Sequence, residues 1–300
     1  MNWLKIIKRI VFAILKGIAA ALAVMLGMVL GGVLTTLLGM QSPSVPPQAS
    51  IDALLPLMFL SAVLAAIVVG ECFQKLPLRY LPRMLSIWLC VYLLYYALNN
   101  LDAFLFSPVP HMSTSFVSYL ANSLLAALVI AWLWKPEEPN RSISLREYFT
   151  TRKPGDWVWR FLLAWLVYPP IYYLVGRAVA PFVKSYYTDP SLNLGLTLPP
   201  VETLLAMQVL RGALFLLAVL PIIFFWQGSR RSLWLWSGTL IFILIAGSIL
   251  IMSYWLPLGL RIPHALELLV DSFLQAGAYA LLLFSAQTMR FGVTPVPVRI

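Results

Sequence analysis

One face of an apolar segment near the C-terminus carries the side chains best suited to chemistry. The segment runs from Pro263 to Gln275, and on a helix His264, Glu267, Asp271 and Gln275 fall at i, i+3, i+7 and i+11, which is one face. Two carboxylates inside a membrane-length segment are costly unless they meet a cation or a watery cavity. This face is therefore the first candidate for a functional site.

A cation deep inside another apolar segment offers these carboxylates a partner. Arg211 lies about 14 Å from the end of its segment at 1.5 Å per residue, and Asp271 lies about 10 Å from the same side. The similar depths predict an Arg211–Asp271 ion pair within about 4 Å, or a cavity that both side chains share. Gln208 lies one turn outward from Arg211 on the same face.

Aromatic and amide side chains from other segments complete the expected site. Tyr172 lies beside Pro169 and Pro170, and two prolines near mid-membrane free backbone carbonyls and kink a helix. Asn99 and Asp102 lie near the end of a third segment on the same side. We expect these groups to line a polar cavity that opens outward. The candidate substrate-binding or ion-binding residues are Arg211, Asp271, Glu267, Gln208, Gln275, His264 and Tyr172.

The same residues allow a purely structural interpretation, in which a buried ion pair fixes helix register and the other polar groups form interhelical hydrogen bonds. Such bonds average only about 0.6 kcal/mol in membranes, so polar residues are retained for modest benefit. A metal site is disfavoured because the chain has only 2 His and 2 Cys. The sequence contains no phosphate-binding loop, dinucleotide fingerprint or nucleophile elbow, and no cofactor is predicted.

Composition places these residues in a membrane protein. Of the 300 residues, 61% are hydrophobic and 11% are charged, whereas about 25% of a soluble domain is charged. Apolar runs long enough to cross a bilayer core of about 30 Å recur along the chain. We therefore predict an all-α polytopic membrane protein with about eight transmembrane helices and no soluble domain. The predicted spans are 10–39, 52–73, 84–106, 114–134, 157–183, 202–226, 232–256 and 264–287.

Basic residues gather in the connections on one side of these spans. Of the 21 Lys and Arg, all but four fall on that side, and the exceptions are Arg177, Lys184, Arg211 and Arg261. The positive-inside rule then predicts a multi-pass protein of the cell inner membrane with both termini in the cytoplasm. The net charge of +10 thus reflects topology, with anionic lipid at the cytoplasmic face as an expected partner. Nucleic-acid binding is disfavoured.

A weak internal repeat suggests two similar halves within a single transmembrane domain. His111 and His264, each preceded by proline, open segments 153 residues apart. The halves would be 1–134 and 157–288, in parallel orientation and joined by a cytoplasmic loop at 135–156. Leu-rich helices align readily by chance, so a bundle without a repeat is the alternative.

Three function classes remain open. A small-solute or ion transporter is favoured by the mid-membrane charges, the proline-broken fifth span and the suggested repeat. A membrane-embedded enzyme acting on lipid or peptide would use His264 and Glu267. An accessory or assembly protein would use its polar residues only to hold helices together.

Overall fold

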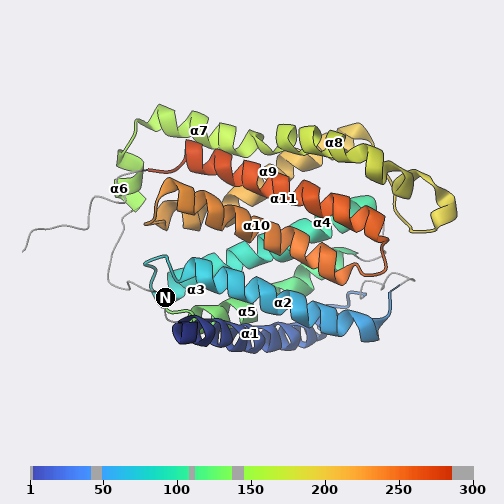
Figure 1. Ribbon diagram of the computed structural model, residues 1–300, viewed down its shortest axis with the longest axis horizontal. Coiled ribbons are helices and arrows are strands. Elements are labelled where there is room, and N and C mark those ends of the chain that lie inside the picture. Colours follow the sequence, from blue (N-terminus) through green and yellow to red (C-terminus); the bar gives the residue numbers. More distant parts are fainter. Residues whose placement is uncertain (1–2, 42–48, 108–111, 137–144, 286–300) are drawn as a thin grey trace, which may run out of the picture.

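The computed structural model describes residues 3–41, 49–107, 112–136 and 145–285, and the regular elements among them are all helical (Figure 1). Eight segments of this part of the chain are long and apolar enough to cross a membrane. They are α1 (Trp3–Leu37), α2 (Ile51–Phe73), α3 to α4 (Tyr80–Phe106), α5 (Met112–Leu133), α7 to α8 (Pro154–Thr188), α9 (Val201–Phe225), α10 (Arg230–Met252) and α11 (Leu258–Leu282). The chain is a multi-pass membrane protein, and the predicted all-helical class with eight spans is confirmed.

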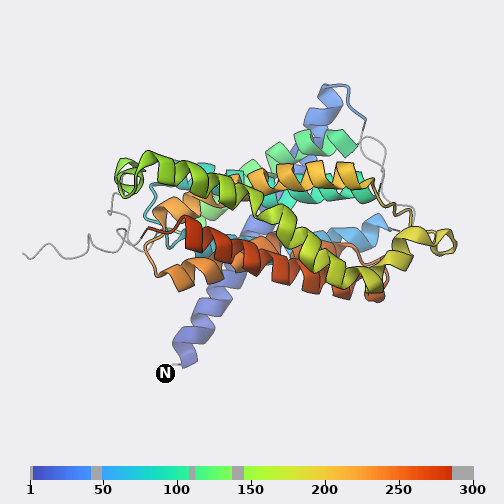
Figure 2. The same cartoon turned by 90° about the horizontal axis from the view of Figure 1, so that it is seen from above.

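The helices are arranged with α1 along one side of the bundle and α7 with α8 along the other (Figure 1). Helix α1 packs on α5 and α2, α10 packs on α2 and α11, and α11 packs on α8. Viewed from above, α1 crosses the remaining helices obliquely and its first turns extend beyond them (Figure 2). Whether the two chain halves are related by a repeat stays a prediction.

Helix α1 is longer than the predicted first span, because one continuous helix begins at Trp3. Small residues let it approach α5 closely. A Cβ atom added at Gly27 would lie 2.6 Å from the Cα of Asn122, and one added at Gly31 would lie 2.5 Å from the carbonyl oxygen of Ser118. Glycines at these positions therefore permit backbone-to-backbone packing between the two helices.

The third span changes its helical pitch midway. It consists of α3 (Tyr80–Cys90), a π-helical stretch η1 (Val91–Ala97) and α4 (Leu98–Phe106). Wider turns of this kind rotate the following residues relative to an ordinary α-helix and are frequent at functional sites. Asn99, just after η1, donates from Nδ2 to the carbonyl oxygens of Tyr95 at 2.9 Å and Leu244 at 3.1 Å.

The fifth span is broken at Val167, between α7 (Pro154–Leu166) and α8 (Tyr168–Thr188), as its paired prolines predict. Pro169 has no N–H, so the carbonyl of Trp165 loses its usual helical donor. Helix α9 approaches this point closely, because a Cβ at Gly212 would lie 2.5 Å from that carbonyl oxygen. The Trp165 indole also donates to the carbonyl of Val209 at 2.8 Å. These contacts fix the part of α9 that carries the predicted site residues.

The eighth span begins six residues earlier than predicted, at Leu258. Pro263 lies inside α11 and does not start it. Transmembrane helices tolerate an internal proline because neighbouring groups satisfy the freed carbonyl. His264 is therefore not at the helix start but more than one turn within it.

The connection predicted as a loop at 135–156 contains a short helix, α6 (Leu145–Thr150). Its Tyr148 is buried and donates a hydrogen bond to the carbonyl of Leu283 at the end of α11. Arg152 donates to the carbonyl of Phe284 at 3.1 Å, and Arg160 donates to that of Leu282 at 2.8 Å. Burial and, next, the positive charge of Arg160 lower the pKa of Arg152. These donors satisfy carbonyls at the end of α11 and complement its dipole.

The contact between α9 and the broken fifth span predicts a sharp response to a single methyl group. Gly212→Ala should lower the free energy of unfolding by about 1–3 kcal/mol, the usual cost of overpacking, because the methyl group meets a backbone oxygen that cannot move aside. Thermal unfolding of the purified protein in one detergent measures the effect. Gly32→Ala is the matched control, since no atom lies within 4 Å of its added Cβ, and it should be neutral or slightly stabilising. Equal midpoints for the two variants would contradict the proposed packing.

Candidate functional site

Five ionisable side chains from three helices meet near the end of the bundle that carries residues 189–200. They are Asp102 of α4, Arg211 of α9, and His264, Glu267 and Asp271 of α11, and we call them the buried charged cluster. Asp102 interacts electrostatically with Arg211, His264 and Glu267, and Asp271 interacts with Glu267 and Arg211. Arg211, Glu267 and Asp271 are buried, whereas Asp102 and His264 are partly exposed. The buried charges act in a medium that screens them weakly.

Arg211 forms its ion pair with Asp102. Its Nη1 lies 2.7 Å from Oδ1 of Asp102, at an angle outside hydrogen-bond geometry, and donates to Oε1 of Gln208 at 3.3 Å. The guanidinium also lies over the ring of Tyr168, 5.3 Å from its centroid. The predicted Arg211–Asp271 ion pair is wrong, because these two groups interact only over a longer distance. Asp102 of α4 is thus the carboxyl that reaches the guanidinium.

Asp271 is a buried carboxyl without a protein partner. Its residue is 3% exposed, and neither side-chain oxygen has a hydrogen-bond partner among the described residues. An ionised carboxylate in such a place is unfavourable by several kcal/mol. Because Arg211 is already paired with Asp102, the Asp271 carboxyl needs a proton, a cation or bound water to compensate its charge.

His264 joins the cluster to the end of α8 through two hydrogen bonds. Its Nε2 lies 2.8 Å from the Tyr187 hydroxyl, and its Nδ1 lies 2.8 Å from Oε2 of Glu267. Since a carboxylate only accepts, Nδ1 donates to Glu267 and the Tyr187 hydroxyl donates to Nε2. This arrangement fixes the tautomer of the ring, which is how a histidine that handles protons is usually oriented.

The remaining predicted residues lie around this cluster with different roles. Gln208 accepts from Arg211, and its Nε2 has no partner among the described residues. Tyr172 interacts electrostatically with Arg211 and Asp102. Gln275, one turn beyond Asp271, donates from Nε2 to the hydroxyl of Tyr279 at 2.7 Å, while its Oε1 is unpartnered in the described chain. Gln275 is therefore hydrogen-bonded to the next turn of its own helix and not to a member of the cluster.

Sequence reasoning missed two residues that complete the site. Tyr187 lies beyond the predicted fifth span, which ends at residue 183, but α8 extends to Thr188 and brings its hydroxyl to His264. Tyr168 directly precedes the paired prolines, and its ring lies under the Arg211 guanidinium. The sequence signal available for both was an aromatic residue at the correct depth, which does not specify a contact.

The connection at 189–200 covers the cluster's end of the bundle. Asp189 accepts from the backbone N–H of Ser191 at 2.9 Å and from its hydroxyl at 2.6 Å, starting a 3₁₀ turn, η2 (Pro190–Leu192). These hydrogen bonds lower the pKa of Asp189. The N–H of Thr197 then donates to the carbonyl of Phe106 at the end of α4, 2.9 Å away. The connection is thus folded back onto the helix that carries Asp102.

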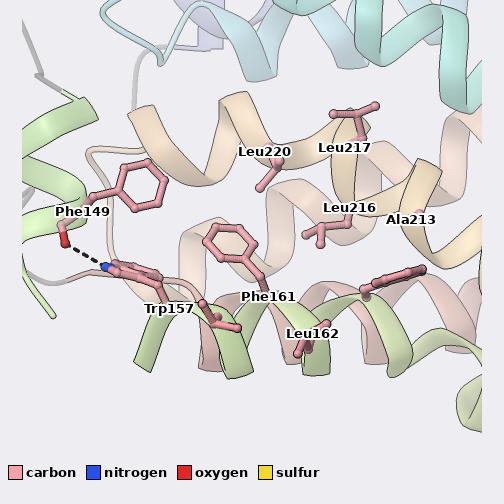
Figure 3. A pocket seen from close by; sticks show the side chains of 10 residues that line it. Phe149, Trp157, Phe161, Leu162, Ala213, Leu216, Leu217 and Leu220 are labelled. Atoms are coloured by element: carbon pink, nitrogen blue, oxygen red, sulfur yellow. Dashed lines mark hydrogen bonds between the residues drawn. The ribbon is translucent and has the colours of Figure 1, made fainter. Parts of the chain in front are cut away.

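Two apolar hollows in the described structure lie away from the cluster. A groove of about 610 Å³ runs between α7 and α9 and is lined by side chains such as Trp157, Phe161, Leu216 and Leu220 (Figure 3). A smaller hollow lies among α2, η1 and α5. Neither contains a member of the buried charged cluster, and the outward-opening polar cavity expected from the sequence stays a prediction. Among the described residues, no three His, Cys, Asp or Glu are grouped to hold a metal ion.

Comparison with protein-family models, with characterised proteins and with solved structures finds no match. The fold and the geometry of the cluster therefore define a class, a helical multi-pass membrane protein with an intramembrane charge cluster, and function is argued from the cluster itself.

The Arg211–Asp102 ion pair predicts strong energetic coupling. Asp102→Asn should lower the free energy of unfolding by about 3 kcal/mol, the lower part of the range for a broken buried pair, because Asp102 keeps 19% exposure while Arg211 has 2%. Arg211→Ala in the Asp102→Asn background should cost much less than it does alone, and thermal unfolding of the four proteins measures the difference. Additive effects would mean that the pair does not hold the helices together.

Proposed function

We propose that the protein transports a small cation or cationic solute across the membrane and that the buried charged cluster is its binding site. The observation that carries this proposal is the charge balance of the cluster. Asp102, Glu267 and Asp271 share a single guanidinium, Arg211, and Asp271 has no hydrogen-bond partner in the described structure. A cation bound among these carboxyls removes an electrostatic cost that the protein's own groups leave uncompensated.

The chemistry of the lining groups favours a cation over an anion. Arg211 is paired with Asp102, so an anion would find no free positive charge. A cation would find the unpartnered oxygens of Asp271 and Gln275, which are ligands suited to hard metal cations and to ammonium groups. The ring of Tyr172, next to that of Tyr168, would suit an organic cation, because aromatic faces attract positive charge.

Helix irregularities next to the cluster support transport. The π-helical stretch η1 precedes Asp102 on the third span, and the break at Val167 adjoins the segment of α9 that carries Arg211. Secondary transporters place binding sites beside discontinuous helices, where backbone groups are freed and one part of the bundle moves against another. The expected outward-opening cavity would form when these elements move apart.

Two other classes explain less of the cluster. The His264–Glu267 hydrogen bond suits a membrane-embedded enzyme with a histidine base. The Nε2 atom of this histidine, however, is hydrogen-bonded to the Tyr187 hydroxyl and not to a Ser or Cys nucleophile. An accessory protein would need only the Arg211–Asp102 ion pair to fix helix register. Neither class gives a reason for the unpartnered carboxyl of Asp271.

The proposed orientation follows from the basic residues of the connections. It places the 189–200 end on the outer side of the cell inner membrane and both termini in the cytoplasm. Basic side chains at the opposite end would contact anionic lipid headgroups. The apolar groove between α7 and α9 would accept an acyl chain from the bilayer (Figure 3).

The transport proposal predicts ion or solute currents that depend on Asp271. Reconstituted protein on a solid-supported membrane is exposed to jumps of Na⁺, K⁺, choline or spermidine, and at least one probe should give a transient current. Asp271→Asn should reduce that current at least tenfold because the variant lacks the charge that binds the cation. Asp52→Asn, an exposed carboxyl at the start of α2, is the matched control and should keep it. Absence of current for every probe in the unaltered protein would count against a cation transporter.

A further inference from the structure

We propose that the coupling ion is a proton and that Tyr187, His264 and Glu267 form a relay that carries it from the 189–200 end to Asp271. The inference rests on the proposed function, because the proton would exchange with the transported cation at Asp271. The geometry that supports it is a directed row of hydrogen-bonding groups that ends at a buried, unpartnered carboxyl.

The first two contacts of the relay are short and correctly directed. Tyr187 and Nε2 of His264 are 2.8 Å apart, and Nδ1 of His264 and Oε2 of Glu267 are also 2.8 Å apart. Both distances lie in the range over which a proton passes along a hydrogen bond. The imidazole uses its two nitrogens on opposite sides, which is the arrangement of a proton shuttle.

Exposure falls in order along α11. The side chain of His264 is 27% exposed and that of Glu267 is 8% exposed, while Asp271 is 3% exposed. The row therefore connects a partly exposed group to a buried one. Polar side chains within apolar helices are costly, so their succession over two turns of α11 argues for use in proton transfer.

The last transfer crosses one helical turn, from Glu267 to Asp271. No hydrogen bond joins the two carboxyls directly, so the Glu267 side chain must swing or use a bridging water. Helix α8 leaves room for this motion at Gly176, where an added Cβ would lie 3.1 Å from Oε1 of Glu267. A larger side chain at Gly176 would confine the carboxyl that has to move.

The groups that face Asp271 come from each neighbouring element. Glu267 lies on its own helix, Arg211 on α9 and Tyr168 on α8, and all three interact with it electrostatically. Helix α10 carries ionisable residues only at Arg230 and Arg231, in its first turn at the opposite end of the bundle. Glu267 repels a charge on Asp271 while Arg211, already paired, compensates it only in part, so a proton on Asp271 relieves the repulsion.

The proton balance of one transfer is simple. Water gives a proton to the Tyr187 oxygen as the hydroxyl proton passes to Nε2, and Nδ1 releases its proton to Glu267. Glu267 then gives this proton to the Asp271 carboxylate. The partly exposed His264 returns to its starting tautomer by releasing the Nε2 proton to water and taking a proton from water at Nδ1, and the Tyr187 hydroxyl rotates back. No bond other than O–H and N–H is made or broken. A cation that binds at Asp271 displaces the proton from the carboxyl.

Proton movement in liposomes tests the relay. Proteoliposomes with a trapped pH-sensitive dye are given a membrane potential with valinomycin and a K⁺ gradient, and the internal pH is followed. Glu267→Gln and His264→Gln should slow protein-dependent proton movement at least tenfold, and Tyr187→Phe should slow it less because His264 is itself partly exposed. Asp52→Asn should match the unaltered protein. Elution as a single species in size-exclusion chromatography establishes that each variant is folded.

The outcomes separate the relay from the transport proposal. Loss of proton movement in Glu267→Gln, with cation-induced current still present at a lower, pH-independent level, supports the relay. Unchanged proton movement in both Glu267→Gln and His264→Gln overturns the relay, whatever the cation currents. Cation currents without any proton movement in the unaltered protein overturn the relay and leave the transport proposal standing. Absence of both signals overturns the transport proposal itself.

Discussion

The site depends on one interaction, the ion pair between Arg211 and Asp102 inside the bundle. A guanidinium that is 2% exposed cannot remain in a membrane protein without an acidic partner, so α4 and α9 must stay in register for the fold to persist. The close packing of Gly212 on the Trp165 carbonyl brings the broken fifth span to the same place. Four spans are thus fixed around one charged pair, with α11 completing the enclosure through Glu267 and Asp271.

Because Asp102 neutralises Arg211, the carboxyls of α11 are left in excess. This excess is the feature that a structural role alone does not explain. Interhelical hydrogen bonds stabilise membrane bundles modestly, and an unpartnered buried carboxyl works against stability. Asp271 is therefore retained at a cost, and binding of a cation or a proton gives a physical reason for retaining it.

The fold class was predictable from sequence because the bilayer imposes it. Apolar length determines spans, so eight were expected and the described residues contain eight, and the two prolines of the fifth span correctly predicted its break. Span ends were less predictable: α11 starts at Leu258 because a membrane helix tolerates Pro263. The short helix α6 was missed because six residues carry too little periodicity to distinguish a helix from a loop.

The depth of the site residues was also predictable, but their pairing was not. Rise per residue gives depth along a helix, and it placed Arg211 and Asp271 at similar levels. The choice between Asp102 and Asp271 depends on how each helix is rotated, and the π-helical stretch η1 changes the rotation of α4 in a way that hydropathy does not encode. The sequence therefore identified most members of the cluster and assigned the ion pair to the wrong carboxyl.

The ionisation states of Asp102 and Asp271 are the most direct measurement of how the cluster balances its charge. Solid-state NMR of ¹³C-labelled protein in bilayers distinguishes a carboxylate from a carboxylic acid by its carbon shift, and Asp102→Asn and Asp271→Asn samples assign the signals. We expect Asp102 to be ionised at neutral pH, as the partner of Arg211, and Asp271 to be protonated when no transported cation is present. A protonated Asp102 together with an ionised Asp271 would contradict the account, because Arg211 would then be compensated by Asp271, and Asp102 would be the carboxyl left in excess.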